Sequence, residues 1–305
     1  MENFITGEKV KSVLKYDKLI QVMEQALSKY SSRLVVQPVR SVVPVEKEGG
    51  FLGLMPSLCE EEKNLGVKLV TFFPHNTERH GVQTHNAVIV LFETRTGVPK
   101  AIMDGEVITT MRTAAVSAVA TKYLAPEGSK KLAILGSGVQ ARSHLQALCT
   151  VCKFTQVTVW SRTFSNAEKC ASEVGGVACQ TAQEAVKDAD VIVTVTGATT
   201  PFLEAAWVKP NAHINAVGAC RPDWSEITPD LMRSSVLYVD SREGALKESG
   251  DVIMSKAEIY AELGEMILGQ KEAQRDKLTV FKSLGMAIED TMAGQLVLDL
   301  LAGKS

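Results

Sequence analysis

The sequence predicts an α/β protein, with a doubly wound parallel sheet in its second half and an α+β domain ahead of it. Short β-branched segments fill the region from Leu34 to Ala101, and strands and helices alternate from Leu132 to Val239. Such alternation is typical of a parallel sheet covered by helices. At 305 residues the chain is longer than a single core usually serves, which also favours two domains.

The first half divides into a helix, several strands and a second helix. Thr6–Tyr30 carries apolar residues at spacings that fit an amphipathic helix. Three later segments are β-branched and bounded by turn residues, so we expect them to be strands. They are Leu34–Val43, Val67–Phe73 and Asn86–Glu93. The small residues of Thr109–Tyr123 predict a closely packed helix that Pro126 and Gly128 end, which suggests a domain boundary near residue 120.

The second half alternates between apolar strand patterns and helical patterns. The expected strands are Leu132–Leu135, Val157–Trp160, Val191–Thr196, His213–Val217 and Val236–Val239. The expected helices are Val139–Cys152, Asn166–Val174 and an apolar helix at Ser283–Leu301. From its residues alone, that last helix could pack on either domain.

Composition narrows the classes of function. Hydrophobic residues make up 45% and charged residues 22%, the balance of a globular protein. A net charge of −2 does not favour nucleic acid or an anionic membrane as partner. The amino-terminal segment favours a polar-faced helix over a signal peptide, and the six cysteines favour reduced thiols in the cytoplasm. The scattered histidines and the single Cys149–Cys152 pair give no metal-ligand pattern, so no metal is expected.

A glycine turn links the first strand of the second half to its first helix. Gly136 permits the tight turn, Gly138 lets the backbone approach a pyrophosphate, and Ala141 allows the helix to pack closely on the strand. The helix N-terminus supplies N–H donors to phosphate. This context predicts a dinucleotide cofactor on a Rossmann-type domain. The expected contacts in the turn are Gly136, Ser137, Gly138, Val139 and Gln140.

The residues after the next strand indicate which dinucleotide binds. NAD-selective domains usually end that strand in Asp or Glu, which binds the ribose 2′-hydroxyl. This chain has Ser161, Arg162 and Thr163 there. Hydroxyl donors and a fixed cation suit a 2′-phosphate, and Arg162 can also stack on adenine. NADP(H) is therefore the predicted cofactor, with NAD(H) and a merely solvated Arg162 as the alternatives.

Three cations lie in otherwise apolar or small-residue surroundings: Arg40, Lys68 and Arg112. A charge in such a place is costly unless it is paired or faces a ligand. Solvated strand and helix faces explain each of them about as well as a ligand does, so the residues alone leave both readings open.

Ordered blocks along nearly the whole chain carry a family resemblance. They are Gln37–Arg40, Lys68–Thr71, Met103–Ala115, Gly136–Gln140, Asn215–Trp224, Ala245–Asp251 and Phe281–Ala287. Together they resemble the ornithine cyclodeaminase/mu-crystallin family, and its mu-crystallin (ketimine reductase) branch most closely. The resemblance implies a Rossmann NADP(H)-binding domain at 120–282. It also implies a substrate and dimerisation domain at 1–119, to which the helix at 283–305 returns, and a homodimer.

The resemblance also implies roles for individual residues. The catalytic residues would be three cations that hold the substrate carboxylate: Arg40, Lys68 and Arg112. Arg112 would also touch the cofactor. The substrate site would be lined by Cys220 and Leu284. Beyond the residues at 136–140 and 161–163, the implied cofactor contacts are Thr84, His85, Thr196 and Val217.

The sequence departs from the cyclodeaminases at Cys220. Those enzymes carry an aspartate there that acts as acid and base, whereas the mu-crystallin branch has a serine that a cysteine imitates in size. A thiol is largely protonated near neutrality, so it does not replace a carboxylate, although Asp223 lies close in sequence. This difference favours a reductase over a cyclodeaminase.

The resulting hypothesis is NADPH-dependent reduction of the C=N bond of a cyclic ketimine carboxylate. Positioning of the carboxylate by cations can supply several kcal/mol, on the order of 7 to 11 at best. Lys68 is the candidate proton donor, because crowding by Arg40 and Arg112 together with desolvation should lower its pKa.

Three other functions stay open at this stage. An opine or alanine dehydrogenase would reduce an imine formed from a keto acid and an amine, and an ornithine cyclodeaminase-type enzyme would share the same scaffold. A non-catalytic crystallin-like protein would keep NADPH and bind a small hydrophobic acid such as a thyroid hormone.

Overall fold

The computed structural model describes residues 4–304, and the chain forms two compact units. Unit 1 holds the residues up to Arg112 together with those from Met286 onward, and unit 2 is Thr113–Gly285. Residues 1–3 and 305, at the two ends of the predicted first domain, lie outside the described residues. The predicted boundary after residue 119 falls inside helix α4 (Gly105–Leu124), within which the chain passes from one unit to the other.

Unit 1 is built on a mixed sheet of seven strands, in the order β1-β7-β6-β5-β4-β2 with β3 also paired to β4. The first pair, β1 with β7, is parallel and the others are antiparallel. The bounds are β1 (Phe4–Ile5), β2 (Val35–Val36), β3 (Ser41–Val45), β4 (Gly50–Cys59), β5 (Asn64–Phe72), β6 (His85–Phe92) and β7 (Pro99–Asp104). The mostly β region that the sequence predicts before Ala101 is confirmed.

The single strand predicted over Leu34–Val43 is wrong. The structure divides it into β2 and β3, and the residues between them, 37–40, belong to no strand. Pro38 lies in that interval and has no N–H to donate to a ladder, which explains the break. Both pieces still pair with β4, so the chain leaves the sheet only for these four positions.

The single helix predicted over Thr6–Tyr30 is also wrong, because the structure has α1 (Gly7–Val13) and α2 (Tyr16–Ser31). Leu14 and Leu19 are both buried, but they are five residues apart. One continuous helix would rotate Leu19 by roughly 140° relative to Leu14, away from a common face. The break between the helices lets both side chains enter the core.

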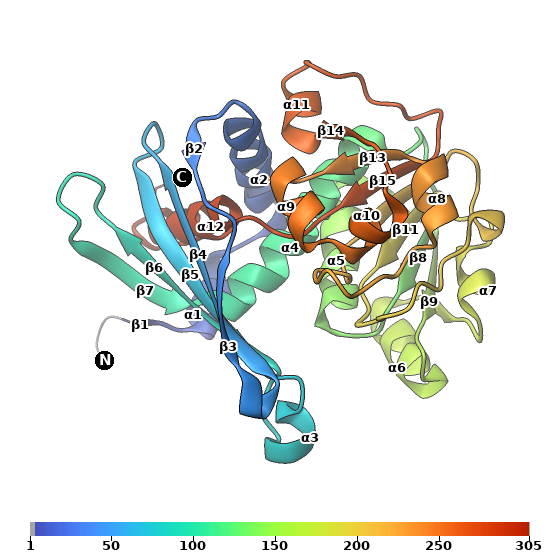
Figure 1. Cartoon of the computed structure of the whole chain (residues 1–305), viewed down its shortest axis with the longest axis horizontal. Coiled ribbons are helices and arrows are strands. Elements are labelled where there is room, and N and C mark those ends of the chain that lie inside the picture. Colours follow the sequence, from blue (N-terminus) through green and yellow to red (C-terminus); the bar gives the residue numbers. More distant parts are fainter. Residues whose placement is uncertain (1–3, 305) are drawn as a thin grey trace. The chain divides into compact units, whose positions relative to one another are not determined.

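The carboxyl-terminal helix α12 (Ala287–Leu301) is the central helix of unit 1. It packs on β4, β5 and β6 and against α2, and Figure 1 shows it in red beside the blue and cyan strands. Its first residues, Ala287–Gly294, are all buried. A short helix α3 (Asn76–His80) and the turn η1 (Glu46–Glu48) complete the helical segments of this unit.

Unit 2 holds a sheet of eight strands in the order β10-β9-β8-β11-β12-β15-β13-β14, and every pair in it is parallel. The bounds are β8 (Lys131–Leu135), β9 (Gln156–Trp160), β10 (Val177–Ala178), β11 (Val191–Thr194), β12 (His213–Ala216), β13 (Val236–Val239), β14 (Ile259–Glu262) and β15 (Thr279–Lys282). The predicted Rossmann-type parallel sheet, with a second α+β domain, is confirmed.

The helices of unit 2 alternate with these strands (Figure 1). They are α5 (Val139–Val151), α6 (Phe164–Val174), α7 (Ala182–Val186), α8 (Pro229–Ser234), α9 (Arg242–Glu248), α10 (Gly250–Ser255), α11 (Leu263–Ile267) and the turn η2 (Ala205–Trp207). Buried aliphatic side chains of β8, β11, β12 and β13 form the core with those of α7 and α8. From β8 the chain runs outward to β9 and β10 and then returns to the other side of β8 at β11. Ligands of such sheets bind at the carboxyl ends of the strands where the order reverses.

Candidate functional site

The glycine turn lies at the carboxyl end of β8, directly before α5. Gly136 has a φ of +130°, and a Cβ there would lie 2.6 Å from the carbonyl oxygen of Val195, so only glycine fits. Gly138 is the N-cap of α5, no side chain caps the helix, and a Cβ at Gly138 would have no atom within 4 Å. Open space ahead of an uncapped helix N-terminus fits a dinucleotide pyrophosphate.

The other turn residues are held from behind or exposed. Ser137 Oγ donates a hydrogen bond to Ser161 Oγ at 2.9 Å, and Arg142 Nη1 donates to the Ser137 and Gly138 carbonyl oxygens at 2.8 and 3.1 Å. Val139 is 59% exposed although it is apolar. Gln140 Oε1 is buried and accepts no hydrogen bond from any described residue. The turn is thus braced by side chains and presents an apolar surface that a bound cofactor can cover.

Ser161, Arg162 and Thr163 follow β9, the neighbour of β8. Arg162 and Thr163 are exposed, Ser161 is half-buried, and Thr163 is the N-cap of α6. Within residues 4–304, Arg162 makes no ion pair. A free guanidinium next to a helix N-terminus, at the position where a carboxylate would bind a ribose hydroxyl, is suited to a phosphate.

Two further predicted cofactor residues follow the next strands of the sheet. Thr196 comes after β11 and Val217 after β12, and the Val217 N–H donates to the Thr194 carbonyl oxygen at 3.0 Å. The N–H and the hydroxyl of Thr196 each donate to Glu226 Oε1 at 2.7 Å. Because all these strands are parallel, the loops after β8, β9, β11 and β12 lie at one edge of the sheet.

The three predicted substrate cations all belong to unit 1. Lys68 is on β5 and Arg112 on α4, and they are only 2% and 4% exposed. Lys68 Nζ lies 2.6 Å from Asp290 Oδ2, and Arg112 Nε donates to Asp290 Oδ1 at 2.9 Å. Arg112 Nη1 also donates to Glu289 Oε2 at 2.8 Å. Asp290 therefore bridges the two cations from the first turn of α12.

Arg40 adds a third positive charge to this cluster. It precedes β3 and is half-buried, and it lies close enough for its charge to lower the pKa of Lys68. Gln37 in the same segment accepts a hydrogen bond from the Ile288 N–H at 2.8 Å, which ties this part of the chain to the start of α12. We name Arg40, Lys68, Arg112, Glu289 and Asp290 the cation cluster.

The cation cluster has an uneven charge. With all five groups ionised, the cluster contains three cations and two carboxylates, a net charge of +1 within these five residues. Burial lowers the pKa of Lys68 from 10.5 to about 8, helped by Arg112 and Arg40 and opposed by Asp290. The direction and causes agree with the lowering predicted from sequence, although the opposing carboxylate was not foreseen. A monoanionic ligand would balance the cluster.

Thr84 and His85 lie at the start of β6 in unit 1. Thr84 Oγ1 and His85 Nδ1 are 3.2 Å apart, and the His85 ring packs on Phe72 with 4.6 Å between centroids. Partial burial lowers the pKa of His85, and the charge of Lys68 lowers it further. His85 is therefore electrostatically coupled to the cation cluster through Lys68 and is favoured in its neutral form.

Cys220 and Leu284 belong to unit 2. Cys220 is an exposed free thiol in the loop after β12, and Leu284 follows β15, where its N–H donates to Asp240 Oδ2 at 2.6 Å. Asp223, the nearby carboxylate, is exposed and pairs with Arg221 at 3.4 Å. The structure therefore places Asp223 in a surface ion pair and not in a buried site.

Sequence reasoning missed three carboxylates that organise these sites: Glu289, Asp290 and Glu226. Each is fully buried. Glu289 and Asp290 follow Gly285–Ile288 in an otherwise apolar segment, and the rule that marked Arg40, Lys68 and Arg112 as costly charges applies equally to them. Applying that rule to anions as well as cations predicts that Glu289 and Asp290 pair with buried cations.

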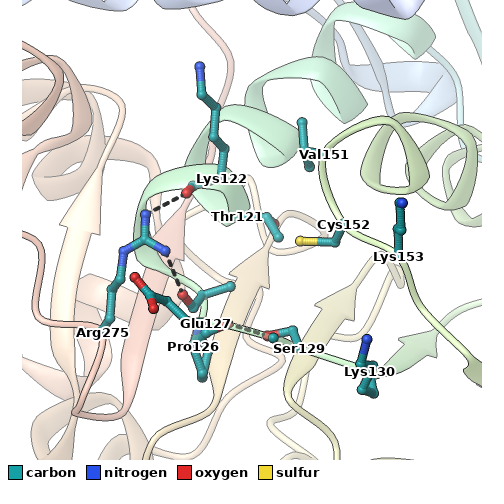
Figure 2. A pocket seen from close by; sticks show the side chains of 12 residues that line it. Thr121, Lys122, Pro126, Glu127, Ser129, Lys130, Val151, Cys152, Lys153 and Arg275 are labelled. Atoms are coloured by element: carbon teal, nitrogen blue, oxygen red, sulfur yellow. Dashed lines mark hydrogen bonds between the residues drawn. The ribbon is translucent and has the colours of Figure 1, made fainter.

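Unit 2 has a further cavity at the opposite end of β8, shown in Figure 2. Lys122, Lys130, Lys153 and Arg275 surround it, but the guanidinium of Arg275 donates to the Lys122 and Ala125 carbonyl oxygens. The three ammonium groups lie far from one another in Figure 2. Cations so arranged form no anion site. Across residues 4–304 there is also no cluster of three metal-binding side chains, and no helix both long and apolar enough to cross a membrane.

Comparison with known proteins agrees with this arrangement. The model of the ornithine cyclodeaminase/mu-crystallin family matches residues 1–305. The chain belongs to this family. Within it, the chain is 54% identical over 302 residues to the ketimine reductase mu-crystallin of Mus musculus, covering 97% of this chain and 96% of that protein. It is therefore a homologue of the ketimine reductase mu-crystallins.

More distant members of the family share the whole fold. The chain is 33% identical to the Δ1-pyrroline-2-carboxylate reductase of Bacillus cereus, over 95% of this chain and 94% of that one. The Thermococcus litoralis Δ1-pyrroline-2-carboxylate reductase, solved with NADH and L-proline, has a TM-score of 0.94 at 35% identity and covers 99% and 98% of the two chains. An archaeal alanine dehydrogenase dimer with bound NAD has a TM-score of 0.92 at 30% identity, covering 99% and 96%.

Proposed function

We propose that this protein is an NADPH-dependent reductase of cyclic ketimine carboxylates. The observation that carries the proposal is the cation cluster, whose three cations and two carboxylates leave one positive charge for one substrate carboxylate. Homology to ketimine reductases and to pyrroline-2-carboxylate reductases supports the reaction class. The bound cofactor supplies a hydride to the imine carbon.

The residues of unit 1 bind the substrate and provide its proton. Arg112 and Arg40 bind the carboxylate, because a guanidinium offers several donors in a fixed plane. Asp290 holds Lys68 and Arg112 in place with bonds of 2.6 and 2.9 Å. Lys68, with a pKa of about 8, is protonated near neutrality and gives a proton to the imine nitrogen.

The residues of unit 2 bind the cofactor. The N-terminus of α5 and the open space at Gly138 accept the pyrophosphate, and Val139 covers part of the dinucleotide. Ser161, Arg162 and Thr163 select NADPH over NADH through the 2′-phosphate. Thr196 and Val217 contact the cofactor from the loops after β11 and β12. We also assign cofactor contacts to Thr84, His85 and Arg112.

Reduction is favoured over cyclodeamination because Cys220 and Asp223 do not supply a buried acid and base. Cys220 is an exposed thiol, and Asp223 is exposed and paired with Arg221. We assign Cys220 and Leu284 as further substrate-binding residues.

We propose a cytoplasmic homodimer. All six cysteines are free, as a reducing compartment would keep them. Val36, Val42 and Val43 on β2 and β3 are more than half exposed, an apolar surface that a second copy would bury. One relative with the same fold is a dimer.

Steady-state kinetics with NADPH test the proposal. Δ1-piperideine-2-carboxylate and Δ1-pyrroline-2-carboxylate should be reduced, whereas pyruvate with alanine, taurine or ammonia should give at least a hundredfold lower kcat/KM. Turnover of the second set alone would establish an opine or alanine dehydrogenase instead. Ammonia release from ornithine would establish a cyclodeaminase.

A further inference from the structure

The carboxylate of Glu226 joins two loops of unit 2. Glu226 is fully buried, and its Oε1 accepts hydrogen bonds from the N–H and the hydroxyl of Thr196, each at 2.7 Å. Its Oε2 accepts from the Thr194 hydroxyl and from the Gly218 N–H, each at 2.8 Å. Thr196 belongs to the loop after β11 and Gly218 to the loop after β12, so one side chain fixes the backbone of both loops.

The fit around this carboxylate leaves no spare room. A Cβ at Gly218 would lie 2.2 Å from the Thr196 carbonyl oxygen and 2.4 Å from Glu226 Oε1. Real Cβ atoms do not approach so closely, so glycine is required there for the loops to meet. The loop after β11 also touches the glycine turn, because the Val195 carbonyl oxygen lies against Gly136.

The place of these loops in the sheet assigns them to one half of the cofactor. The pyrophosphate site is at β8, and the residues proposed to bind the 2′-phosphate follow β9 on one side of it. The adenosine half therefore lies toward β9, and the nicotinamide half extends in the other direction, over the carboxyl ends of β11 and β12. These are the two loops that Glu226 joins.

We infer that Glu226 is a positioning residue for the nicotinamide half of the cofactor, acting through the loops that carry Thr196 and Gly218. This inference rests on the proposed function. Glu226 touches neither the substrate nor the reacting atoms and acts only by fixing the two loops.

The hydrogen-bond donors around Glu226 favour an ionised carboxylate. Backbone N–H groups can only donate, and one lies against each oxygen of Glu226. Burial raises the pKa of Glu226 and the charge of Asp251 adds to this, whereas Lys282 and the two threonine hydroxyls oppose it. Lys282 is itself buried and paired with Asp251 at 3.0 Å.

Glu226→Gln tests the inference with little change in volume. Whichever way the new amide turns, its NH₂ faces a backbone N–H, either that of Thr196 or that of Gly218, so one loop must move. We expect the affinity for NADPH to fall about tenfold, the scale of one lost hydrogen bond to a charged group. The affinity for 2′,5′-ADP, which contains only the adenosine half, should change less than twofold.

Two more variants distinguish a loss of loop positioning from a general loss of stability. Asp251→Asn alters the carboxylate that accepts the Ser225 hydroxyl and the N–H groups of Glu226 and Ile227, at the far end of the loop after β12. These hydrogen bonds do not involve Thr196 or Gly218, so the change should leave both affinities within twofold. Thr194→Val removes one donor to Glu226 at nearly constant shape and should weaken NADPH binding two- to threefold with no effect on 2′,5′-ADP. Circular dichroism and urea unfolding report the fold of each variant.

The outcomes separate the claims. Equal losses for NADPH and 2′,5′-ADP, no loss in Glu226→Gln and Thr194→Val, or the same loss in Asp251→Asn would overturn the positioning role. Because these are binding measurements, the expected pattern in a chain that reduces no cyclic ketimine would uphold the inference about Glu226 and reject only the proposed reaction. A wild-type chain that binds neither ligand would overturn both.

Discussion

Each unit of this protein buries a group of charged side chains, and the two groups are built differently. In unit 1, Lys68 and Arg112 pair directly with Asp290 and Glu289, and with Arg40 nearby the cluster carries an excess positive charge. In unit 2, Glu226 and Asp251 lie near one cation, Lys282, so the net charge of these three described residues is negative when all are ionised.

The partners of the carboxylates also differ. Glu226 and Asp251 accept backbone N–H groups as well as side-chain donors, so they fix loops whether or not a ligand is present. Among residues 4–304, the side-chain partners of Asp290 are Lys68 and Arg112, and these cations are the groups suited to an acid substrate. We propose from this comparison that an anionic ligand completes the cluster of unit 1, whereas backbone N–H groups already stabilise the carboxylates of unit 2.

The largest effect should come from removing the carboxylate that bridges the cations. Asp290→Asn leaves Lys68 and Arg112 buried with only Glu289 to balance them, which should lower the free energy of unfolding by about 3 to 5 kcal/mol. Urea unfolding of the full chain measures this. Asp251→Asn should cost less, because Glu226 remains beside Lys282. A loss no greater than that of Asp251→Asn would contradict the difference drawn between the two clusters.

The next largest effect should come from removing the proton that Lys68 gives to the imine nitrogen. Lys68→Arg keeps the positive charge, but a guanidinium does not release a proton, so kcat should fall about a hundredfold while the substrate KM stays within about threefold. In the wild type, Lys68 is protonated below its pKa of about 8, so kcat/KM should be level there and fall roughly tenfold per pH unit above it. The variant should lose this limb of the profile.

Lys282→Arg is the matched control for that experiment, since Lys282 is the other fully buried lysine with a carboxylate partner. It should retain both kcat and the pH profile. If Lys68→Arg kept the limb near pH 8, the titration would belong to the imine substrate, and the role assigned to Lys68 would be wrong.

A smaller effect is expected at the ribose of the cofactor. Arg162→Ala should weaken NADPH binding about tenfold, the scale of a charge-assisted hydrogen bond at an exposed position, and leave NADH binding nearly unchanged. Lys169→Ala removes another exposed cation, on α6, and should change neither. Fluorescence titration with each cofactor gives the values. Equal affinity for NADPH in Arg162→Ala and the wild type would remove the argument for NADP(H).

The sequence predicted unit 2 better than unit 1 for a physical reason. The strands of a parallel sheet are covered on both faces, so β8 and β11 to β13 stand out as short apolar runs between turns. In unit 1 the ends of helices and strands depended on single residues that interrupt the spacing of apolar side chains. Pro38 interrupts a strand, and the five-residue step from Leu14 to Leu19 interrupts a helical stripe.

The same contrast holds for the candidate sites. The glycine turn was predictable because its residues are adjacent in sequence and each has a steric reason to be there. Asp290 meets Lys68 and Arg112 only through the fold, over separations of 222 and 178 positions. Glu226 meets Thr196 over 30 positions, from the loop after the next parallel strand. The spacing of apolar residues along a sequence predicts which face of a helix is buried, but it does not predict which residue pairs with a buried charge.

The most direct test of the account is to remove the carboxylate from the substrate instead of a side chain from the protein. With NADPH saturating, kcat/KM should be measured for Δ1-piperideine-2-carboxylate and for Δ1-piperideine, which has the same imine without the acid group. The excess charge of the cation cluster predicts a kcat/KM at least a hundredfold higher for the carboxylate. Equal values for the two imines would show that Arg40, Lys68 and Arg112 do not bind a substrate carboxylate.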